Sequence, residues 1–463
     1  MNNSAGVNDF IAADSKDLIF WTVRSVCDTK LNMFTTIKDI LPGVTLHLHP
    51  TDKFKTIVAK LFVRQPLVNS FEATLNAMLL RVMSRGSGKF PSMRKMSVFM
   101  ESLYGASFGS DISKIGEYSI LEYYIEFLSP SFVQSRVLRS KMTQKAFGFI
   151  KDMLLNPLTE GKKLRPDYCK QEQQQLKDFI EGLFDDKMSF AEERCTQEMC
   201  KTEPYGIFEY GTIEDIARVT PELLYQHHRK VLVSAPIEIF AVGQFKPEQL
   251  AKAVVSILKP FKSLHKDIKD TKITIKNPPA PAEPRVIKEN QPIDQGKLVM
   301  GLRTDTTWKD DDVFNLMVAN GVLGGFPHSK LFRNVREKAG LAYFVFSIIE
   351  RTKGLMMIKA GINHDKFDQA VAIIKEQIEA LKQADIPDKE LSDTKKSIIT
   401  RLKSVEDTAS AMINFYQELI LNGRTGISIK DIIGRIDAVS KDDVAAAARK
   451  LKLDTIYFLT SNK

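Results

Sequence analysis

Two side chains in the second half of the sequence could stabilise negative charge on a peptide carbonyl. They are the guanidinium of Arg336 and the phenol of Tyr343, which lies seven residues further along. Both groups can donate hydrogen bonds to a carbonyl oxygen or to the oxyanion of a tetrahedral intermediate. Taken alone, this spacing also fits a surface arginine followed by a half-buried tyrosine of a sheet, so it leaves both interpretations open.

A helix followed by a strand is predicted to position this pair. Three apolar residues have the spacing of one buried helical face: Leu331, Phe332 and Val335. Gly340 is expected to end the helix, and the segment 341–347, LAYFVFS, has the composition of a strand. The end of the helix and the start of the strand would then hold the guanidinium and the phenol near each other.

The segment from 321 to 347 resembles the second domain of the insulinase/pitrilysin/mitochondrial-processing-peptidase family. In that family a Gly-rich turn precedes the motif S-R-L-F-x-x-V-R-E-K-x-G-L-A-Y, and this sequence has GVLGG at 321–325 and SKLFRNVREKAGLAY at 329–343. The resemblance implies that Arg336 and Tyr343 reach into a catalytic chamber. We also predict substrate contacts from the turn and the histidine after it: Gly321, Gly324, Gly325 and His328.

The zinc motif of the same family, H-x-x-E-H on a helix of its first domain, is missing. The turn that follows this helix is recognisable as RGSGKFP, and counting back from it places the motif positions at Ala77, Leu80 and Arg81. The family's third ligand, a glutamate ahead of an acidic pair, falls on Phe179. Alanine, leucine and phenylalanine cannot bind a metal, and arginine stays protonated. We therefore predict no bound metal, no cofactor and no hydrolysis by this chain alone.

The first half nevertheless keeps the pattern of a folded domain. Strands are predicted at 45–49 and 56–63, which would form a hairpin, and helices at 69–82 and 92–103. Asn69 is placed to cap the first of these helices. This order of elements indicates an α+β fold with an antiparallel sheet. The resemblance implies two homologous domains of this kind, which together form half of a clamshell.

A proline-rich segment and an internal repeat divide the chain. Four prolines occur between 278 and 284, where they favour an extended linker. A helix capped by Thr220 and the strand after it are repeated about 220 residues later by a helix capped by Ser440 and a second strand. We predict four segments: an N-terminal extension at 1–35, a first insulinase-like domain at 36–258, a linker at 259–291 and a second insulinase-like domain at 292–463.

The composition is that of a globular chain. Of the 463 residues, 43% are hydrophobic and 27% are charged, which excludes a disordered protein. No apolar run is long enough to span a membrane, and the beginning of the sequence does not resemble a secretory signal. The four cysteines are scattered without CxxC spacing and indicate reduced thiols, so we expect a cytoplasmic protein.

Charge and histidines add little to the site. The net charge of +9 comes from basic residues mixed with acidic ones, which indicates a solvated surface and no nucleic-acid partner. The alternative interpretation, an electropositive cavity wall that attracts acidic peptide or nucleic acid, remains open. His47 and His49 share one face of a strand and could chelate a metal, but no carboxylate or cysteine is near them in sequence. His227 and His228 are adjacent in a helix, so their side chains point apart.

Two functions remain open. The first is a non-catalytic subunit of a heterodimeric zinc peptidase, which would pair with a zinc-bearing paralogue and contribute Arg336 and Tyr343 to cleavage of a peptide substrate. Segments 53–56, 103–106 and 198–206 look like a bacterial subgroup of inactive family members, which are typically encoded beside such a paralogue. The alternative is a peptide-binding or assembly protein of the same fold without a role in proteolysis. A homodimer is the other assembly that the sequence allows.

Overall fold

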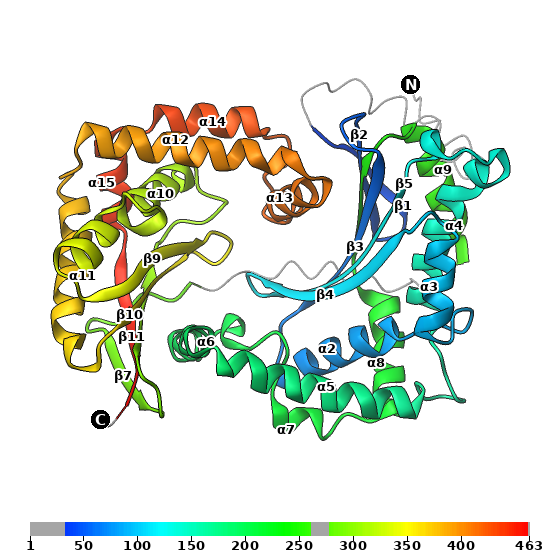
Figure 1. The fold of residues 1–463 in the computed structure, drawn as a ribbon, viewed down its shortest axis with the longest axis horizontal. Coiled ribbons are helices and arrows are strands. Elements are labelled where there is room, and N and C mark those ends of the chain that lie inside the picture. The colour runs from blue at the N-terminus through cyan, green and yellow to red at the C-terminus, as the bar shows by residue number, and fades with distance from the viewer. Residues whose placement is uncertain (1–32, 261–276, 462–463) are drawn as a thin grey trace, which may run out of the picture.

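Two β-sheets flanked by helices form the part of the chain that the computed structural model describes, residues 33–260 and 277–461 (Figure 1). The first sheet has the order β1-β2-β6-β3-β5-β4, and the second has the order β7-β11-β8-β10-β9. The first consists of β1 (Thr35–Leu41), β2 (Val44–Pro50), β3 (Thr56–Pro66), β4 (Ser107–Ile115), β5 (Tyr118–Leu128) and β6 (Ile237–Gly243). The second consists of β7 (Arg285–Asn290), β8 (Gly296–Arg303), β9 (Ala342–Glu350), β10 (Leu355–Ile362) and β11 (Lys452–Thr460). The α+β class is confirmed.

The two sheets repeat one topology, to which β1 is an addition. β6 pairs parallel with β2 and antiparallel with β3, and β11 pairs in the same way with β7 and β8. The helices ahead of these strands are α8 (Pro221–Ser234) and α15 (Lys441–Arg449), and Thr220 and Ser440 cap them as predicted. Each sheet therefore contains one parallel pair, which the expectation of an antiparallel sheet did not include.

The predicted hairpin between residues 45–49 and 56–63 is wrong, although both strands exist. β6 lies between β2 and β3 and bonds to both, so the two strands that are consecutive in sequence do not pair with each other. Consecutive strands are often but not always neighbours in a sheet. Here a strand from the end of the first half completes the ladder between them, and no local sequence signal marks that insertion.

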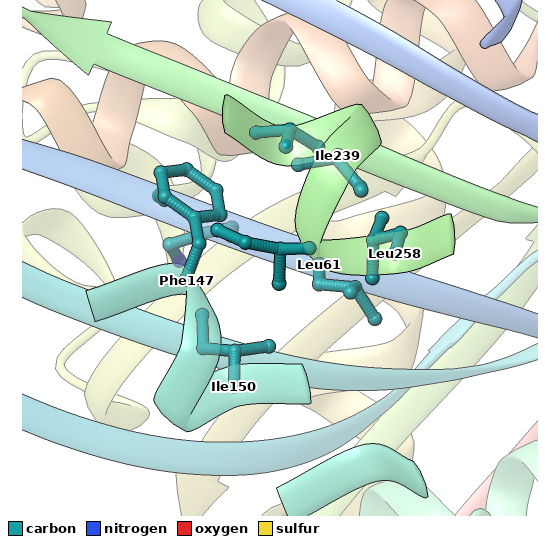
Figure 2. Close-up of a pocket in the computed structure, with 9 residues that line it drawn as sticks. Leu61, Phe147, Ile150, Ile239 and Leu258 are labelled. Atoms are coloured by element: carbon teal, nitrogen blue, oxygen red, sulfur yellow. The ribbon is translucent and has the colours of Figure 1, made fainter. Parts of the chain in front are cut away.

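Helices cover one face of the first sheet and form the first apolar core with it. They are α2 (Ser70–Ser84), α3 (Met93–Glu101), α4 (Arg136–Leu155), α5 (Pro166–Asp185), α7 (Ile213–Ile216), α8 and α9 (Pro247–Leu258). The same half also contains the single turns η1 (Pro130–Phe132) and η2 (Pro204–Gly206), and η2 packs against α6 (Lys187–Met199). Figure 2 shows Leu61, Phe147 and Leu258 around a small cavity in this core. Its volume of about 10 Å³ is at the lower limit for holding one water molecule. The apolar cavity is therefore a packing gap in the core.

The second half contributes a helical layer that also reaches the first sheet. It contains α10 (Val313–Asn320), the π-helical turns η4 (Gly321–Gly325) and η5 (Phe332–Lys338), α11 (Phe367–Lys382), α12 (Asp388–Ser404), α13 (Ala409–Leu421), α14 (Ile429–Ala438) and α15, with single turns η6 (His364–Lys366) and η7 (Val405–Asp407). α13 packs against β3 and β6, and Lys60 Nζ donates to Asn414 Oδ1 at 2.8 Å. Val58, Phe62 and Phe240 of the first sheet belong to the same apolar core as this layer.

The boundary between the halves is interwoven. α6 (Lys187–Met199) belongs to the first half by sequence, but it packs against β8 and β11 of the second sheet (Figure 1). β7 lies inside the range 259–291 predicted as linker, so that part of the prediction is wrong. The alternation of exposed and half-buried residues in RVIKEN is that of an edge strand with little apolar signal. Of the predicted linker, 261–276 lie outside the described residues, as do residues 1–32 of the predicted N-terminal extension.

A buried network of charges joins the two sheets at this boundary. Lys353, in the turn between β9 and β10, is fully buried and donates to Glu117 at 2.6 Å and to Glu203 at 2.7 Å. Arg303 donates to the other oxygen of Glu203 at 2.6 Å and to Asp454 at 3.0 Å. Burial alone would raise the pKa of Glu203, but the hydrogen bonds from Arg303 and Lys353 lower it overall. These hydrogen bonds thus favour the ionised form of Glu203 between the two halves.

Candidate functional site

Helix α2 lies where the zinc-binding helix is expected, and the first ligand position and the general-base position of its motif lie in the core. Asn69 caps the helix and accepts a hydrogen bond from the backbone N–H of Glu72 at 2.8 Å, as predicted. Ala77 and Leu80, at the first ligand and the general-base positions, are 0% and 3% exposed and belong to the first apolar core. Neither side chain can bind a metal or accept a proton.

The remaining two degenerate positions meet in the structure. The guanidinium of Arg81 on α2 lies over the ring of Phe179 on α5, 5.5 Å from its centre. Arg81 Nε donates to Glu172 Oε2 at 3.0 Å, and Arg85 donates to the other oxygen of this buried carboxylate. The positions of the family's second and third zinc ligands are far apart in sequence and lie side by side in the structure. In this chain they hold a cation–π pair and no metal ligand.

An aromatic wall continues behind Phe179. The ring of Tyr210 packs edge-on against Phe179, with the ring centres 4.9 Å apart. Burial raises the pKa of Tyr210 to about 12, so its phenol stays protonated at neutral pH. Across residues 33–260 and 277–461, no group of three or more His, Cys, Asp or Glu side chains could hold a metal ion. The arrangement at α2 and α5 does not fit zinc, and the carboxylate beside it, that of Glu172, is paired with Arg81 and Arg85.

The four histidines considered as metal ligands have other partners. His47 Nε2 donates to Glu238 Oε2 at 2.7 Å, and His49 Nδ1 lies 2.5 Å from a backbone carbonyl oxygen. His227 bonds to the side chain of α2 residue Asn76 at 2.7 Å, whereas His228 bonds to a carbonyl oxygen of α4 at 2.8 Å. The two adjacent histidines therefore point to different helices. Burial lowers the pKa of each to about 4.

The signature arginine lies on a π-helical turn. Residues 329–338 were expected to form an ordinary helix, but η5 is wound more widely, and the N–H of Ala339 donates to the carbonyl of Asn334 at 3.2 Å. Such turns are frequent at functional sites. Arg336 is exposed, and its guanidinium lies over the ring of Phe332, 4.7 Å from its centre. Gly340 ends the turn with a φ of 63°, which a glycine adopts without strain.

The signature tyrosine lies on a bulge at the edge of the second sheet. β9 is an edge strand, and its register with β10 shifts between Gly361 and Ile362, which face Phe344 and Ala342. Tyr343 is the extra residue between these pairs. Bulges redirect a side chain and often lie next to active sites. The side chain of Tyr343 is 64% exposed, which makes its phenol available to another molecule.

The structure places Arg336 and Tyr343 on consecutive elements without direct contact between them. Within the described residues, the two side chains share no hydrogen bond or ring contact. Both are exposed, so both remain free to donate. Their ability to act on one substrate group therefore depends on what is bound against η5 and β9.

The Gly-rich turn before the signature allows close packing. A Cβ on Gly324 would lie 2.6 Å from the backbone nitrogen of Ser347 on β9, and one on Gly321 would lie 2.5 Å from Cγ2 of Thr394 on α12. Both glycines are buried. His328 is half-buried: its ring stacks on Phe326 with the ring centres 5.5 Å apart, and its Nε2 lies 3.2 Å from the Thr394 hydroxyl. The turn is thus fixed against β9 and α12.

A pocket beside this turn was not predicted from the sequence. It has a volume of about 190 Å³ and includes Gly321 and Gly325 among its lining residues. Its apolar walls come from five separate segments: Trp308, Met317, Phe326, Ile349, Ile398 and Phe415. Two arginines, Arg351 and Arg401, also line it. No sequence motif joins these positions, because only the fold of the second half brings them together.

Comparisons with known proteins identify the family. A family model described as the peptidase M16 inactive domain matches residues 218–398. A protein of Bacillus subtilis (strain 168), described as the probable inactive metalloprotease YmfF, is 33% identical over 418 residues, which cover 90% of this chain and 96% of that protein. The chain belongs to the peptidase M16 family. This confirms the resemblance drawn from the signature around Arg336.

Two solved structures share the fold over nearly the whole chain. A conserved protein from Enterococcus faecalis V583 has a TM-score of 0.86 and 27% identity, with coverage of 93% of this chain and 99% of that one. The structure of a peptidase M16 inactive domain from Pseudomonas fluorescens has a TM-score of 0.73 and 17% identity, with coverage of 93% and 98%. The M16 architecture of two helix-covered sheets therefore extends through both halves.

Proposed function

We propose that this chain is a non-catalytic subunit of an M16 zinc peptidase and pairs with a zinc-bearing paralogue. One contrast carries the proposal. The positions of the family's zinc ligands and general base hold Ala77, Leu80 and a stacked pair of Arg81 and Phe179, whereas Arg336 and Tyr343 of the second signature remain exposed. A chain that lost its chemistry but kept its substrate-facing donors fits a supporting role in a partner's active site.

In this role Arg336 and Tyr343 act as hydrogen-bond donors. The partner binds the metal and activates water, and this chain holds two donors against the peptide where negative charge develops. Fixed donors aimed at an oxyanion lower the barrier because they need no reorganisation during the reaction. The guanidinium offers a charge-assisted bond and the phenol a neutral one, so Arg336 is the stronger donor.

The same proposal includes substrate contacts from the Gly-rich turn and a chamber enclosed by the two subunits. The glycines of η4 and His328 would contact the peptide through the face of the turn that they shape. The complex would form a closed chamber, and each subunit would supply one half of the clamshell.

The proposed compartment is the cytoplasm, in keeping with Cys169, Cys195 and Cys200, which are buried free thiols. In the described residues, no helix is long and apolar enough to cross a membrane. The competing function is a non-proteolytic peptide-binding or assembly protein, and a homodimer is the competing assembly.

Co-purification with the zinc-bearing paralogue tests the proposal. We expect a stable heterodimer that cleaves unstructured peptides in a chelator-sensitive manner, whereas this chain alone is inactive. The paralogue alone should be much slower than the complex, because it lacks the donors of the second chain. Equal turnover by the paralogue with and without this chain would exclude the supporting role and favour the assembly function.

A further inference from the structure

The pocket beside the Gly-rich turn is suited to a ligand in both size and shape. It lies between the turn η4, the end of β9, and helices α12 and α13. Its volume of about 190 Å³ far exceeds the cavity of about 10 Å³ in the core of the first half. An apolar cavity of about 150 Å³ is known to hold benzene, and pockets for drug-sized ligands begin at about 300 Å³. The pocket therefore suits a single ring or a large aliphatic side chain.

The walls match such a group chemically. Trp308 is fully buried and Ile398 on α12 is 7% exposed, so both present fixed apolar surface. Phe326 and Phe415 add aromatic surface. Burial of apolar area in a preformed pocket is the main source of affinity for small ligands. A polar or small side chain would leave this surface uncovered.

One of the two arginines is available to an anion. Arg351 lies over the ring of Trp308 at 4.8 Å and donates to both oxygens of Glu418 at 3.1 Å, so its charge is paired. Arg401 is exposed and lies over the ring of Phe326 at 5.0 Å, and it has no acidic partner in the described parts of the chain. The unpaired guanidinium gives the pocket a net positive charge, which favours a carboxylate and disfavours a lysine or arginine side chain.

Two polar atoms of lining residues also lack partners. Asn320 Oδ1 and Arg351 Nε are buried without a hydrogen-bond partner among the described residues. Buried polar groups in native proteins are normally satisfied. A ligand with an amide N–H and a carbonyl would bring a donor and an acceptor to this wall. A peptide backbone has both groups.

We propose that this pocket binds the C-terminal residue of a peptide, with an aromatic or large aliphatic side chain in the pocket and the free α-carboxylate at Arg401. The inference rests on the proposed function only in taking a peptide as the ligand. It assigns to the non-catalytic chain a preference for one class of peptide end. Arg401 would be the residue that separates a free C-terminus from an internal peptide segment.

Binding of small probes to the full-length chain tests this assignment. The chain has two tryptophans, Trp21 and Trp308. In a Trp21→Phe variant, the tryptophan fluorescence therefore comes from Trp308 in the pocket wall and reports on binding there. We expect N-acetyl-phenylalanine to change its fluorescence with a dissociation constant on the order of 1 mM, as usual for a ligand of this size. N-acetyl-phenylalanine amide should bind about fivefold more weakly, because it lacks the carboxylate. N-acetyl-alanine should give no change.

Two variants separate the side chain from the carboxylate. Arg401→Gln should weaken the acid about fivefold and leave the amide unchanged. Its matched control is Arg435→Gln, which removes a guanidinium that lies over Phe314 on another helix and outside the pocket lining. Val405 also lines the pocket, so Val405→Phe should fill it and abolish binding of both probes at an unchanged melting temperature. If that variant does not fold, the comparison of acid and amide on Arg401→Gln still decides the carboxylate assignment.

The outcomes distinguish this inference from the proposed function. Equal binding of acid and amide, or an acid affinity unaffected by Arg401→Gln, overturns the carboxylate assignment. No binding of either probe overturns the pocket as a peptide site. Both results leave the heterodimer test untouched, because that test measures turnover with the zinc-bearing paralogue. Conversely, acid-selective binding by a chain that does not enhance turnover would support the pocket and exclude the supporting role.

Discussion

Helix α2 and the turn η5 lie in corresponding connections of the two halves, yet the polar groups of α2 and those of the unit formed by η5 and β9 are in opposite states. α2 lies between β3 and β4, and η5 lies between the corresponding strands β8 and β9. On α2, Arg81 is paired with a buried carboxylate and stacked on Phe179, whereas Arg336 and Tyr343 are exposed. A charged group with its own partner in the fold contributes to stability, and a group without one is free to bind another molecule. Mutations in the two regions should therefore change different measurements.

The largest expected effect is on turnover and comes from the second region. Arg336→Ala should lower turnover of the assembled heterodimer by about 10²–10³, roughly 3–4 kcal/mol, because an oxyanion donor is lost while the metal stays in place. Melting temperature and complex formation should not change. Arg435→Ala serves as the control, since it also removes an arginine stacked on a ring. A lower melting temperature with unchanged turnover per complex would instead make Arg336 structural.

The next effect is on stability at low pH and concerns two histidines of α8, one of which bonds to α2. Burial lowers the pKa of His227 and of His228 from 6.5 to about 4, so each is neutral in the folded chain while it takes up a proton in the unfolded chain. Their contribution to stability is present above pH 6.5 and is lost as the pH falls toward 4. We expect a loss of about 2 kcal/mol for each histidine between pH 7 and pH 5. In urea unfolding, His227→Gln should reduce this pH dependence.

A smaller effect on turnover is expected for the phenol. Tyr343→Phe removes a neutral donor and should lower turnover about tenfold, or roughly 1.4 kcal/mol, less than loss of the guanidinium. Tyr104→Phe is the matched control, because Tyr104 is 49% exposed and lies outside the signature. If both variants behave alike, the bulge at Tyr343 has no role in catalysis.

A stability effect of about 1 kcal/mol is expected when the ion pair on α2 is broken. Glu172→Gln leaves Arg81 and Arg85 without their carboxylate, but their side chains are 29% and 23% exposed, so water can partly replace it. Glu181→Gln, on the same helix and 54% exposed, is the control. Thermal unfolding should show the difference, and turnover of the complex should stay the same. A loss of turnover would mean that the degenerate site contacts the substrate.

For the content of bound zinc we expect no change at all, which is the smallest effect in this series. Elemental analysis after dialysis should find no stoichiometric metal in the unmodified chain. Restoring His, Glu and His at Ala77, Leu80 and Arg81 should not change this, because Phe179 still supplies no third ligand. About one tightly held zinc per unmodified chain would contradict the comparison, since the first region would then hold a metal in spite of its side chains.

The sequence predicts local features of this fold better than its long-range pairings. The caps at Asn69 and Ser440 and the strand of the signature depend on neighbouring residues, and all three are found. The hairpin was wrong because β6 joins the sheet from a distant part of the chain. β7 was taken for linker because its polar sequence has little apolar signal.

The candidate site was predictable only where a family motif marks it. The motif indicated Arg336 and Tyr343, and counting from family landmarks indicated Arg81 and Phe179, which the structure brings together. The bulge at Tyr343 and the availability of Arg401 have no sequence signal. They depend on the register between two strands and on the arrangement of helices around a turn. Such properties arise from packing between distant segments.

The buried charges between the two sheets have a consequence for how the chain can be divided. The proline-rich segment at 278–284 suggests a place to separate two fragments. A cut there would leave Glu117 and Glu203 in the first fragment and their partners Lys353 and Arg303 in the second. Loss of one partner of a buried ion pair costs about 3–5 kcal/mol, and α6 would also lose the sheet that it covers. Neither fragment should be expected to fold by itself, so gene fusions and truncations should preserve the chain from β1 to β11.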